Sequence, residues 1–390
     1  MTSPSDDGLV RGYAGRLLVA ISTGWFAIQA GRLVLSPMLS ALTADIHITN
    51  TKAGFAFTTL WGLYALLQYP SGRLSDALSR KTLLVTGLGM ASGGFVVLAT
   101  ARSYAALLVG AAIVGTGAGL YPTAARALVA DLYSTKQGRA FGLHTASGDL
   151  GGMSAAGIAA VALALLSWRY AFVPIVGLTA AVAIALHVWS RESYVFERRS
   201  LAVRDTAARL LSGTQFRWIL VAYTLYAFTW QAIAAFLPTF FTDGKEFAPV
   251  VGTVAFGALF AVGAIAKPTA GTLSDTISRR ALAVGALVLG AAALSAVVVV
   301  PSPVAAVGAV VVFAAGLLAF PPVMQSYLMD AFPPESAGGD LGAMRTVYIG
   351  LGALGPTYVG AVSTAANYEI AFWGLVGALI VAAVIIARVT

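Results

Sequence analysis

Gly72-Arg73-Leu74-Ser75-Asp76-Ala77-Leu78-Ser79-Arg80-Lys81 is a short polar stretch between two long apolar segments. Closely similar chemistry returns 199 residues later as Gly271-Thr272-Leu273-Ser274-Asp275-Thr276-Ile277-Ser278-Arg279-Arg280. Each copy has a glycine, an aspartate four residues on, and two adjacent basic residues just after. Two copies half a chain apart, each between hydrophobic segments, indicate a duplicated membrane protein.

The composition agrees with a membrane protein. Of the 390 residues, 58% are hydrophobic and 10% are charged, whereas soluble domains carry about 25% charged residues. A transmembrane helix needs about 20 mostly apolar residues, so the chain has room for about twelve of them. Little is left for a soluble catalytic domain, which takes about 100–150 residues.

Twelve apolar runs predict the helices. Continuous runs favour helices over a barrel, whose strands alternate in character every second residue. We therefore expect an all-α integral membrane fold with helices at about 16–42, 53–71, 82–101, 104–130, 140–166, 169–190, 216–241, 250–270, 281–300, 304–329, 341–364 and 368–388.

The basic residues lie mostly on one side of these spans. Lys52, Arg102, Arg169 and Lys245 fall in loops on one side, and Arg32, Arg126, Lys267 and Arg345 fall inside predicted helices. The remaining 16 of the 24 basic residues belong to the side that holds both termini. The positive-inside rule then predicts cytoplasmic termini in a plasma membrane protein. Residues 1–8 do not resemble a cleaved signal peptide, because they are polar and acidic.

The duplication sets the domain organisation that we expect. The charged segment 191–215 is interpreted as a cytoplasmic linker between six-helix bundles at 1–190 and 216–390. At the same offset of 199, Tyr121-Pro122 pairs with Phe320-Pro321 and Arg32 pairs with Gln231. Such repeats are a recurring plan of secondary transporters, with the substrate held between the halves.

The two polar stretches resemble the loop signature of the major facilitator superfamily, and the twelve spans and basic central loop fit it across the chain. The signature residues present here are Gly72, Asp76, Arg80, Lys81, Gly271, Asp275, Arg279 and Arg280. Both copies lack one basic residue and one glycine of the signature. The resemblance implies a transporter made of two pseudo-symmetric bundles that works by alternating access.

The resemblance also implies roles for particular residues. When the cytoplasmic side is closed, each signature aspartate would contact the start of a helix in the other half, Asp76 near Arg345 and Asp275 near Arg139. These contacts would break when the halves rock. Arg126 and Arg345, each near a helix end, are interpreted as an inner gate or as surface charges. Gly115-Thr116-Gly117-Ala118-Gly119 is similar to a second family motif, but Ala111 stands where that motif has arginine. The Gly-Pro pair of drug antiporters is missing from Ser147–Gly152.

Arg32 is the leading candidate for substrate binding. A charge inside a bilayer helix costs at least about 2.5–3.5 kcal/mol and needs a partner or a function. A guanidinium can grip a carboxylate or phosphate through two hydrogen bonds, so Arg32 predicts an anion site. The alternative is a structural arginine paired with backbone carbonyls or a carboxylate.

Aromatic and amide side chains near Arg32, and at matching positions, extend this candidate site. They suit a polar substrate in an apolar cavity, although aromatic residues also pack helices and anchor them at the interface. The candidates are Trp25, Gln29, Trp61, Tyr64, Tyr226, Trp230 and Gln231.

Asp149 is the one acid well inside a predicted helix. It is a candidate proton carrier, because burial raises the pKa of a carboxyl group. It could equally neutralise Arg126 or Arg32, and His144 could join either arrangement. For Lys267, extension of its side chain to the cytoplasmic surface is the favoured interpretation.

The sequence thus predicts a membrane permease for a small solute, with an organic or inorganic anion favoured and coupling to H⁺ left open. An efflux transporter for hydrophobic or cationic compounds and a non-transporting sensor remain alternatives. With no cysteine and three scattered histidines, we expect no enzymatic activity, no metal and no cofactor. The expected partners are the substrate and the lipid bilayer, without nucleic acid, and we expect a monomer.

Overall fold

The computed structural model describes residues 9–74, 78–165, 167–195, 213–332 and 337–389, and these residues form helices and loops without strands. The first half of the chain holds α1 (Gly12–Leu33), α2 (Leu39–Asp45), α3 (Asn50–Leu66), α4 (Gln68–Leu74), α5 (Arg80–Thr100), α6 (Tyr104–Leu132), α7 (Gln137–Leu165), the 3₁₀ turn η1 (Trp168–Ala171) and α8 (Phe172–Trp189). The second half holds α10 (Thr214–Thr239), the π turn η2 (Phe240–Gly244), α11 (Pro249–Leu273), α12 (Arg279–Val299), α13 (Pro303–Ala331), α14 (Ala337–Gly352), α15 (Leu354–Ala365) and α16 (Tyr368–Val389).

The predicted all-α membrane fold is confirmed, and each apolar run coincides with one helix or with consecutive helices. Among the described residues, nine helices are long and apolar enough to cross a membrane. Their outward faces carry large apolar side chains, such as Ile184, Val188 and Val304, which lie exposed. Such faces suit lipid rather than water.

Three predicted spans are interrupted, and each interruption falls four residues before a proline. α1 ends at Leu33, α3 ends at Leu66 and α14 ends at Gly352. Proline at position i removes the hydrogen bond to the carbonyl of residue i−4 and crowds that carbonyl. Pro37, Pro70 and Pro356 stand at these positions. These breaks explain why the single continuous helices expected at 16–42, 53–71 and 341–364 are each divided.

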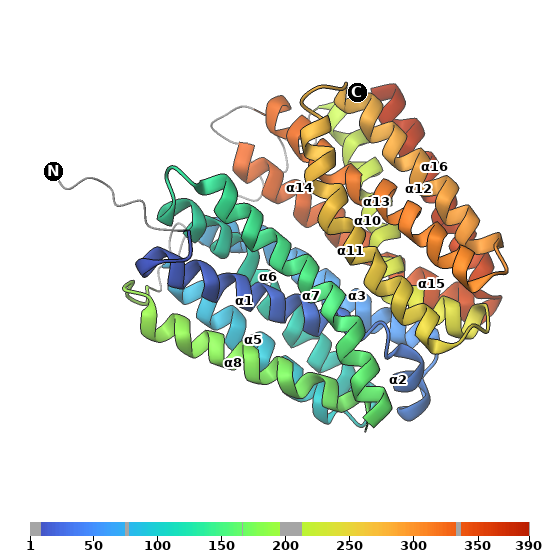
Figure 1. The fold of residues 1–390 in the computed structure, drawn as a ribbon, viewed down its shortest axis with the longest axis horizontal. Coiled ribbons are helices and arrows are strands. Elements are labelled where there is room, and N and C mark those ends of the chain that lie inside the picture. The colour runs from blue at the N-terminus through green and yellow to red at the C-terminus, as the bar shows by residue number, and fades with distance from the viewer. Residues whose placement is uncertain (1–8, 75–77, 166, 196–212, 333–336, 390) are drawn as a thin grey trace.

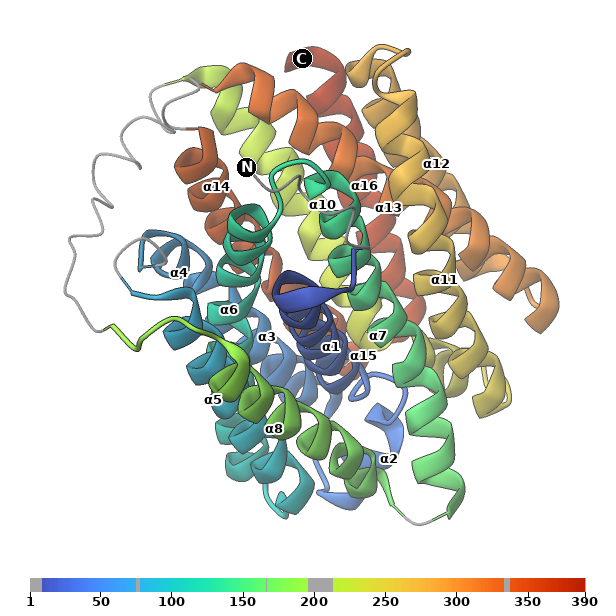
Figure 2. The same ribbon diagram turned by 60° about the vertical axis from the view of Figure 1, so that its left-hand side comes forward.

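The helices form two groups, α1–α8 and α10–α16 (Figure 1). Within the first group α6 packs between α3 and α5, and α1 packs on α7 and α8. Within the second group α13 packs between α11 and α12, and α10 packs on α14 and α16. The groups meet through α3 against α15 and α7 against α11, and Figure 2 shows α7 beside α11 from a second direction. Most of the expected linker, 196–212, lies outside the described residues.

The same polar contacts recur in both groups at an offset of 199 residues. Arg80 forms an ion pair with Asp131 at 3.1 Å, and Arg279 forms one with Asp330. Ser79 caps α5 and Ser278 caps α12, each by accepting a backbone N–H. The structural repeat therefore extends to the side chains that tie each polar stretch to its own group.

Several hydrogen bonds between the two groups lie at one end of the molecule. We call this the far end, where α1 ends and α16 begins, and the opposite end the terminal end. At the far end Ser36 Oγ donates to the carbonyl of Ala235 at 2.9 Å, and Thr58 Oγ1 lies 2.7 Å from Thr357 Oγ1. In Figure 1 the groups converge near α2 and α15 and diverge toward the terminal end.

Short α2 is fixed at the far end by Asp45. Its Oδ2 atom lies 2.7 Å from a guanidinium nitrogen of Arg169 and accepts a hydrogen bond from the indole of Trp168 at 3.3 Å. The hydrogen bond from Arg169 lowers the pKa of Asp45. Arg169 also donates to the carbonyl of Ala101, so one residue ties the α5, η1 and α2 ends together.

Glycines of the second motif allow α6 to pack closely on two neighbours. A Cβ atom at Gly115 would lie 2.3 Å from the carbonyl oxygen of Leu60 on α3, and one at Gly119 would lie 2.7 Å from that of Tyr64. A Cβ atom at Gly117 would lie 2.5 Å from a backbone nitrogen of α5. The motif residues present here therefore serve helix packing, and they fix the position of Tyr64.

We predict that Gly115→Ala destabilises the protein. The added methyl would meet backbone that cannot move aside, and overpacking of this kind costs about 1–3 kcal/mol. Gly89→Ala on α5 is the matched control, because a Cβ atom there would meet nothing within 4 Å. The thermal midpoint of the detergent-solubilised protein, followed by size-exclusion chromatography, should fall for Gly115→Ala alone. Equal midpoints for the two variants would contradict this packing.

Candidate functional site: buried cations between the two helix groups

Arg32 lies in the last turn of α1 and its side chain is 3% exposed. Helical side chains lean toward the N-terminus of their helix, so the guanidinium points back toward the middle of the protein. There it contacts two rings of α3, with its central carbon 4.2 Å from the ring centres of both Trp61 and Tyr64. Cation–π contacts of this kind contribute about 0.5–2 kcal/mol each.

The aromatic contacts leave two hydrogen-bond donors of Arg32 unused. Its Nε and Nη1 atoms are buried without a hydrogen-bond partner. Among the described residues no carboxylate forms an ion pair with it, so the structural alternative of a carboxylate partner does not hold there. A buried guanidinium held by its faces, with donors free at its edge, is arranged to bind an anion.

Two further arginines approach each other from opposite groups. Arg126 of α6 and Arg345 of α14 interact electrostatically with one another, and each also interacts with Tyr64 and Tyr348. Arg126 donates from Nε to the carbonyl of Pro122 at 3.1 Å, while Arg345 Nε is buried without a partner. Both residues are half-buried, and the interpretation of Arg126 as an inner gate or a surface charge stays a prediction.

Tyr348 belongs to this cluster and was missed by the sequence analysis. It stacks on Tyr223 of α10, with ring centres 4.1 Å apart. The sequence spacing could have indicated Tyr348, because it follows Arg345 by three residues and therefore lies on the same helix face.

The other candidates on α1 lie toward α7. Trp25 stacks near Tyr121 and His144, with ring centres 6.5 Å and 6.3 Å away. Gln29 is half-buried and its Oε1 atom has no hydrogen-bond partner. Gly148 makes room for the Trp25 ring, because a Cβ atom there would lie 2.3 Å from its Nε1.

The candidates on α10 pack within their own group. Gln231 donates to the carbonyl of Ile349 at 2.9 Å, and Tyr226 packs against Phe320 with ring centres 4.9 Å apart. Trp230 meets Phe260 edge to face. None of the described contacts joins these three residues to Arg32, so the structure brings together Arg32, Trp61 and Tyr64 and leaves the α10 residues as a separate set.

Asp149 is paired across the two groups. It is 8% exposed and its Oδ1 lies 2.5 Å from Nζ of Lys267 on α11. The expected extension of Lys267 to the surface is replaced by this ion pair, with 31% of its side chain still exposed. Arg32 and Arg126, the partners considered for Asp149, are likewise not its ion-pair partners. His144 is 4% exposed, with Nδ1 unpaired, and interacts electrostatically with Arg126.

The signature residues mostly stabilise their own groups. Arg80 and Arg279 form the repeated ion pairs, Lys81 donates to the carbonyl of Ser190 at 3.2 Å, and Arg280 donates to that of Ala387. Gly72 is half-buried beside Thr123, while a Cβ atom at Gly271 would meet open space.

The predicted contact between Asp275 and the start of α7 is not formed. Asp275 and Arg139 are both exposed, and among the described residues neither side chain has a hydrogen bond or ion pair. The physical reason is the divergence of the two groups at this end (Figure 1). Asp76 lies outside the described residues, so its predicted contact near Arg345 stays a prediction.

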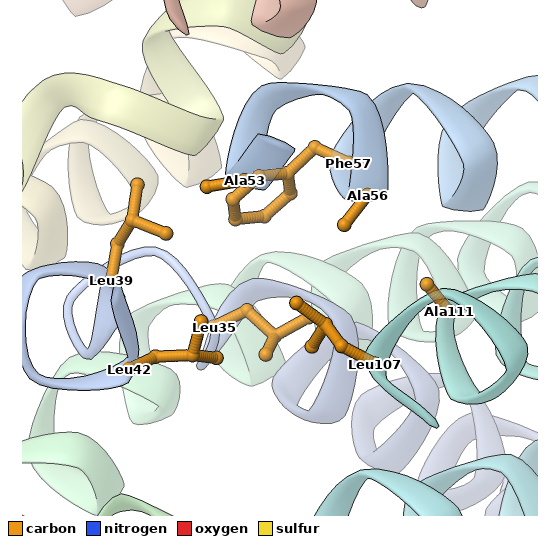
Figure 3. A pocket seen from close by; sticks show the side chains of 8 residues that line it. All are labelled: Leu35, Leu39, Leu42, Ala53, Ala56, Phe57, Leu107 and Ala111. Carbon is orange, nitrogen blue, oxygen red and sulfur yellow. The ribbon is translucent and has the colours of Figure 1, made fainter. Parts of the chain in front are cut away.

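An apolar pocket lies near the far end, apart from the cations. Figure 3 shows its lining, which comes from the α1–α2 connection, α2, α3 and α6: Leu35, Leu39, Leu42, Ala53, Ala56, Phe57, Leu107 and Ala111. No polar side chain faces this pocket, so it does not suit an anion. Among the described residues, no group of three or more acidic, histidine or cysteine side chains could hold a metal ion.

Helices that span a membrane, arranged as two repeated groups with charges between them, define a multi-pass membrane protein of the transporter class. The family model of the Major Facilitator Superfamily matches residues 21–356 and, again, residues 249–390. The chain therefore belongs to this superfamily, as its loop signature predicted, and it is a membrane transporter.

Curated relatives and solved structures agree with this assignment. The chain is 24% identical to the inner membrane transport protein YnfM of Escherichia coli over 61% of its own length and 63% of that protein, and 22% identical to an uncharacterized transporter, YybO of Bacillus subtilis, over 54% and 53%. The matches thus span about half to two thirds of these two relatives.

The fold also matches solved transporters over nearly the whole chain. A bacterial homologue of the human lysosomal transporter Spinster superposes with a TM-score of 0.83 at 16% identity, covering 97% of both chains. The nucleoside transporter NupG superposes with a TM-score of 0.81 at 12% identity, covering 96% of this chain and 99% of that one. These likenesses establish the fold.

Proposed function

We propose that this transporter moves a small anion across the membrane by alternating access, with Arg32 as the principal substrate-binding residue. The observation that carries the proposal is the guanidinium of Arg32, which is buried between two aromatic rings with unpaired donors at its edge. An intramembrane charge without a partner is expected to serve a function. An organic or inorganic anion supplies the missing acceptors.

Alternating access is supported by the distribution of contacts between the groups. Hydrogen bonds at the far end join the α1–α2 connection, α2 and α3 to α10, η2 and α15, while the predicted contact of Asp275 at the terminal end is unmade. We infer that the terminal end is the open side in this conformation. By the distribution of basic residues, that side faces the cytoplasm.

Proton coupling is a further part of the proposal, with Asp149 as the proton carrier. A proton on Asp149 would remove its attraction for Lys267 and weaken the link between α7 and α11. Because this ion pair joins the two groups, its protonation state and the movement of the groups would depend on each other.

We predict that Arg32→Gln abolishes saturable anion uptake. Uptake of a panel of labelled organic and inorganic anions into proteoliposomes measures this directly. Arg16→Gln is the matched control, because Arg16 lies on the same helix, is exposed and bonds only the carbonyl of Gly12. Uptake that survives in Arg32→Gln would make Arg32 structural. If wild-type protein takes up no anion but exports cationic or hydrophobic compounds, it is an efflux transporter.

We predict that a disulfide at the far end stops transport. Ser40 Oγ and Thr242 Oγ1 are 3.4 Å apart across the two groups, and the sequence has no native cysteine. The double variant Ser40→Cys/Thr242→Cys should lose uptake after oxidation and regain it with a reducing agent, because the far end could no longer open. Each single variant should stay active throughout. Full activity of the crosslinked protein would exclude opening at this end.

We predict that Asp149→Asn uncouples uptake from the proton gradient. The variant should still exchange labelled for unlabelled anion, but an imposed pH gradient should no longer raise accumulation above equilibrium. Lys267→Gln provides the comparison, since it breaks the same ion pair and keeps the carboxyl group. A gradient response that persists in Asp149→Asn would show that the pair is structural only.

A further inference from the structure

We propose that the substrate carries two anionic groups, and that Arg126 and Arg345 form a second anion-binding site that receives the group not bound by Arg32. This inference rests on the proposed function, because it assigns two further residues to the binding of the same substrate. It concerns two residues for which the sequence suggested only a gate or a surface position.

The geometry of this second site comes from two helices of different groups. Arg126 belongs to α6 and Arg345 to α14, and their guanidinium groups interact with each other. Two like charges held near one another inside a protein repel, since the interior screens them less than water does. A negative charge placed close to both would relieve this repulsion.

No protein carboxylate supplies that charge within the described part of the chain. Arg126 and Arg345 are absent from every ion pair found there, and Asp149 is engaged by Lys267. Arg345 also has an Nε donor that is buried and unpaired. Neither arginine thus has a carboxylate partner there, and Arg345 keeps a free hydrogen-bond donor, as Arg32 does.

Tyr64 connects the two sites. Its ring lies against the guanidinium of Arg32 at 4.2 Å, and its side chain also interacts with Arg345 and Arg126. One small molecule beside Tyr64 can therefore reach both sites. A monoanion compensates one of them, whereas a dicarboxylate or a phosphorylated carboxylate compensates both.

Such a substrate would act on the two helix groups as well as bind to them. An anionic group between Arg126 and Arg345 replaces a repulsion between α6 and α14 with two attractions. It would draw the groups together on the side where they diverge in Figure 1. A substrate with two anionic groups would therefore favour closure more strongly than a monoanion does.

The test compares anions matched in size that differ in charge. Butyrate and succinate, with a phosphorylated hydroxy acid as a third probe, are assayed as inhibitors of labelled-anion uptake in proteoliposomes. Wild-type protein should prefer succinate over butyrate by about 10- to 100-fold, because the second carboxylate gains charge-assisted hydrogen bonds. In Arg126→Gln and in Arg345→Gln this preference should fall toward unity. Arg16→Gln, which also removes one positive charge, should keep it.

The outcomes separate the inference from the function on which it rests. Arg32-dependent uptake of butyrate and succinate with equal affinity, unchanged in both variants, would overturn the second site and leave an anion transporter. Absence of any anion uptake by the wild type would overturn both. If Arg126→Gln fails to fold, Arg345→Gln on the other group tests the same site, and loss of the succinate preference there supports it.

Discussion

Backbone hydrogen bonding in lipid is the constraint on which the rest of this structure depends. Because lipid offers no partners for peptide groups, each apolar run must be helical. Where Pro37, Pro70 and Pro356 remove a bond, the helix ends at Leu33, Leu66 and Gly352. These breaks occur in α1–α2, α3–α4 and α14–α15, and both helices of the α3–α4 pair contact the α14–α15 pair of the other group. Such interruptions are tolerated where other helices cover them.

Charged side chains inside the protein also lack water as a hydrogen-bonding partner, and each interior cation is stabilised by a different set of neighbours. Lys267 has a carboxylate, Arg32 has two aromatic faces, and Arg126 and Arg345 have tyrosines and each other. Asp149, one of the two buried acids of the described residues, is engaged by Lys267. Arg32, Arg126 and Arg345 form no ion pair with a carboxylate of the described residues.

The sequence predicted the fold well and the site in part. The apolar runs predicted the helices, and the offset of 199 residues predicted the repeat. Both features can be read from the local sequence. The break positions were not readable from proline alone, because Pro122, Pro238 and Pro268 lie inside helices that continue past them. The partner of Asp149 was not readable, because it depends on how α7 packs against α11. The separation of Gln231 from Arg32 depends in the same way on packing between helices distant in sequence.

The repeat itself indicates where function resides. Residues that stabilise each group are alike at equivalent positions: Arg80–Asp131 matches Arg279–Asp330, and Ser79 matches Ser278. Interior residues differ, since Gln231 stands opposite Arg32 and Gln68 stands opposite Lys267. A scaffold with two equivalent halves needs the same contacts twice, but an asymmetric solute cannot be bound by two identical surfaces. Differences in charge between equivalent positions are therefore expected where a binding site lies between the halves.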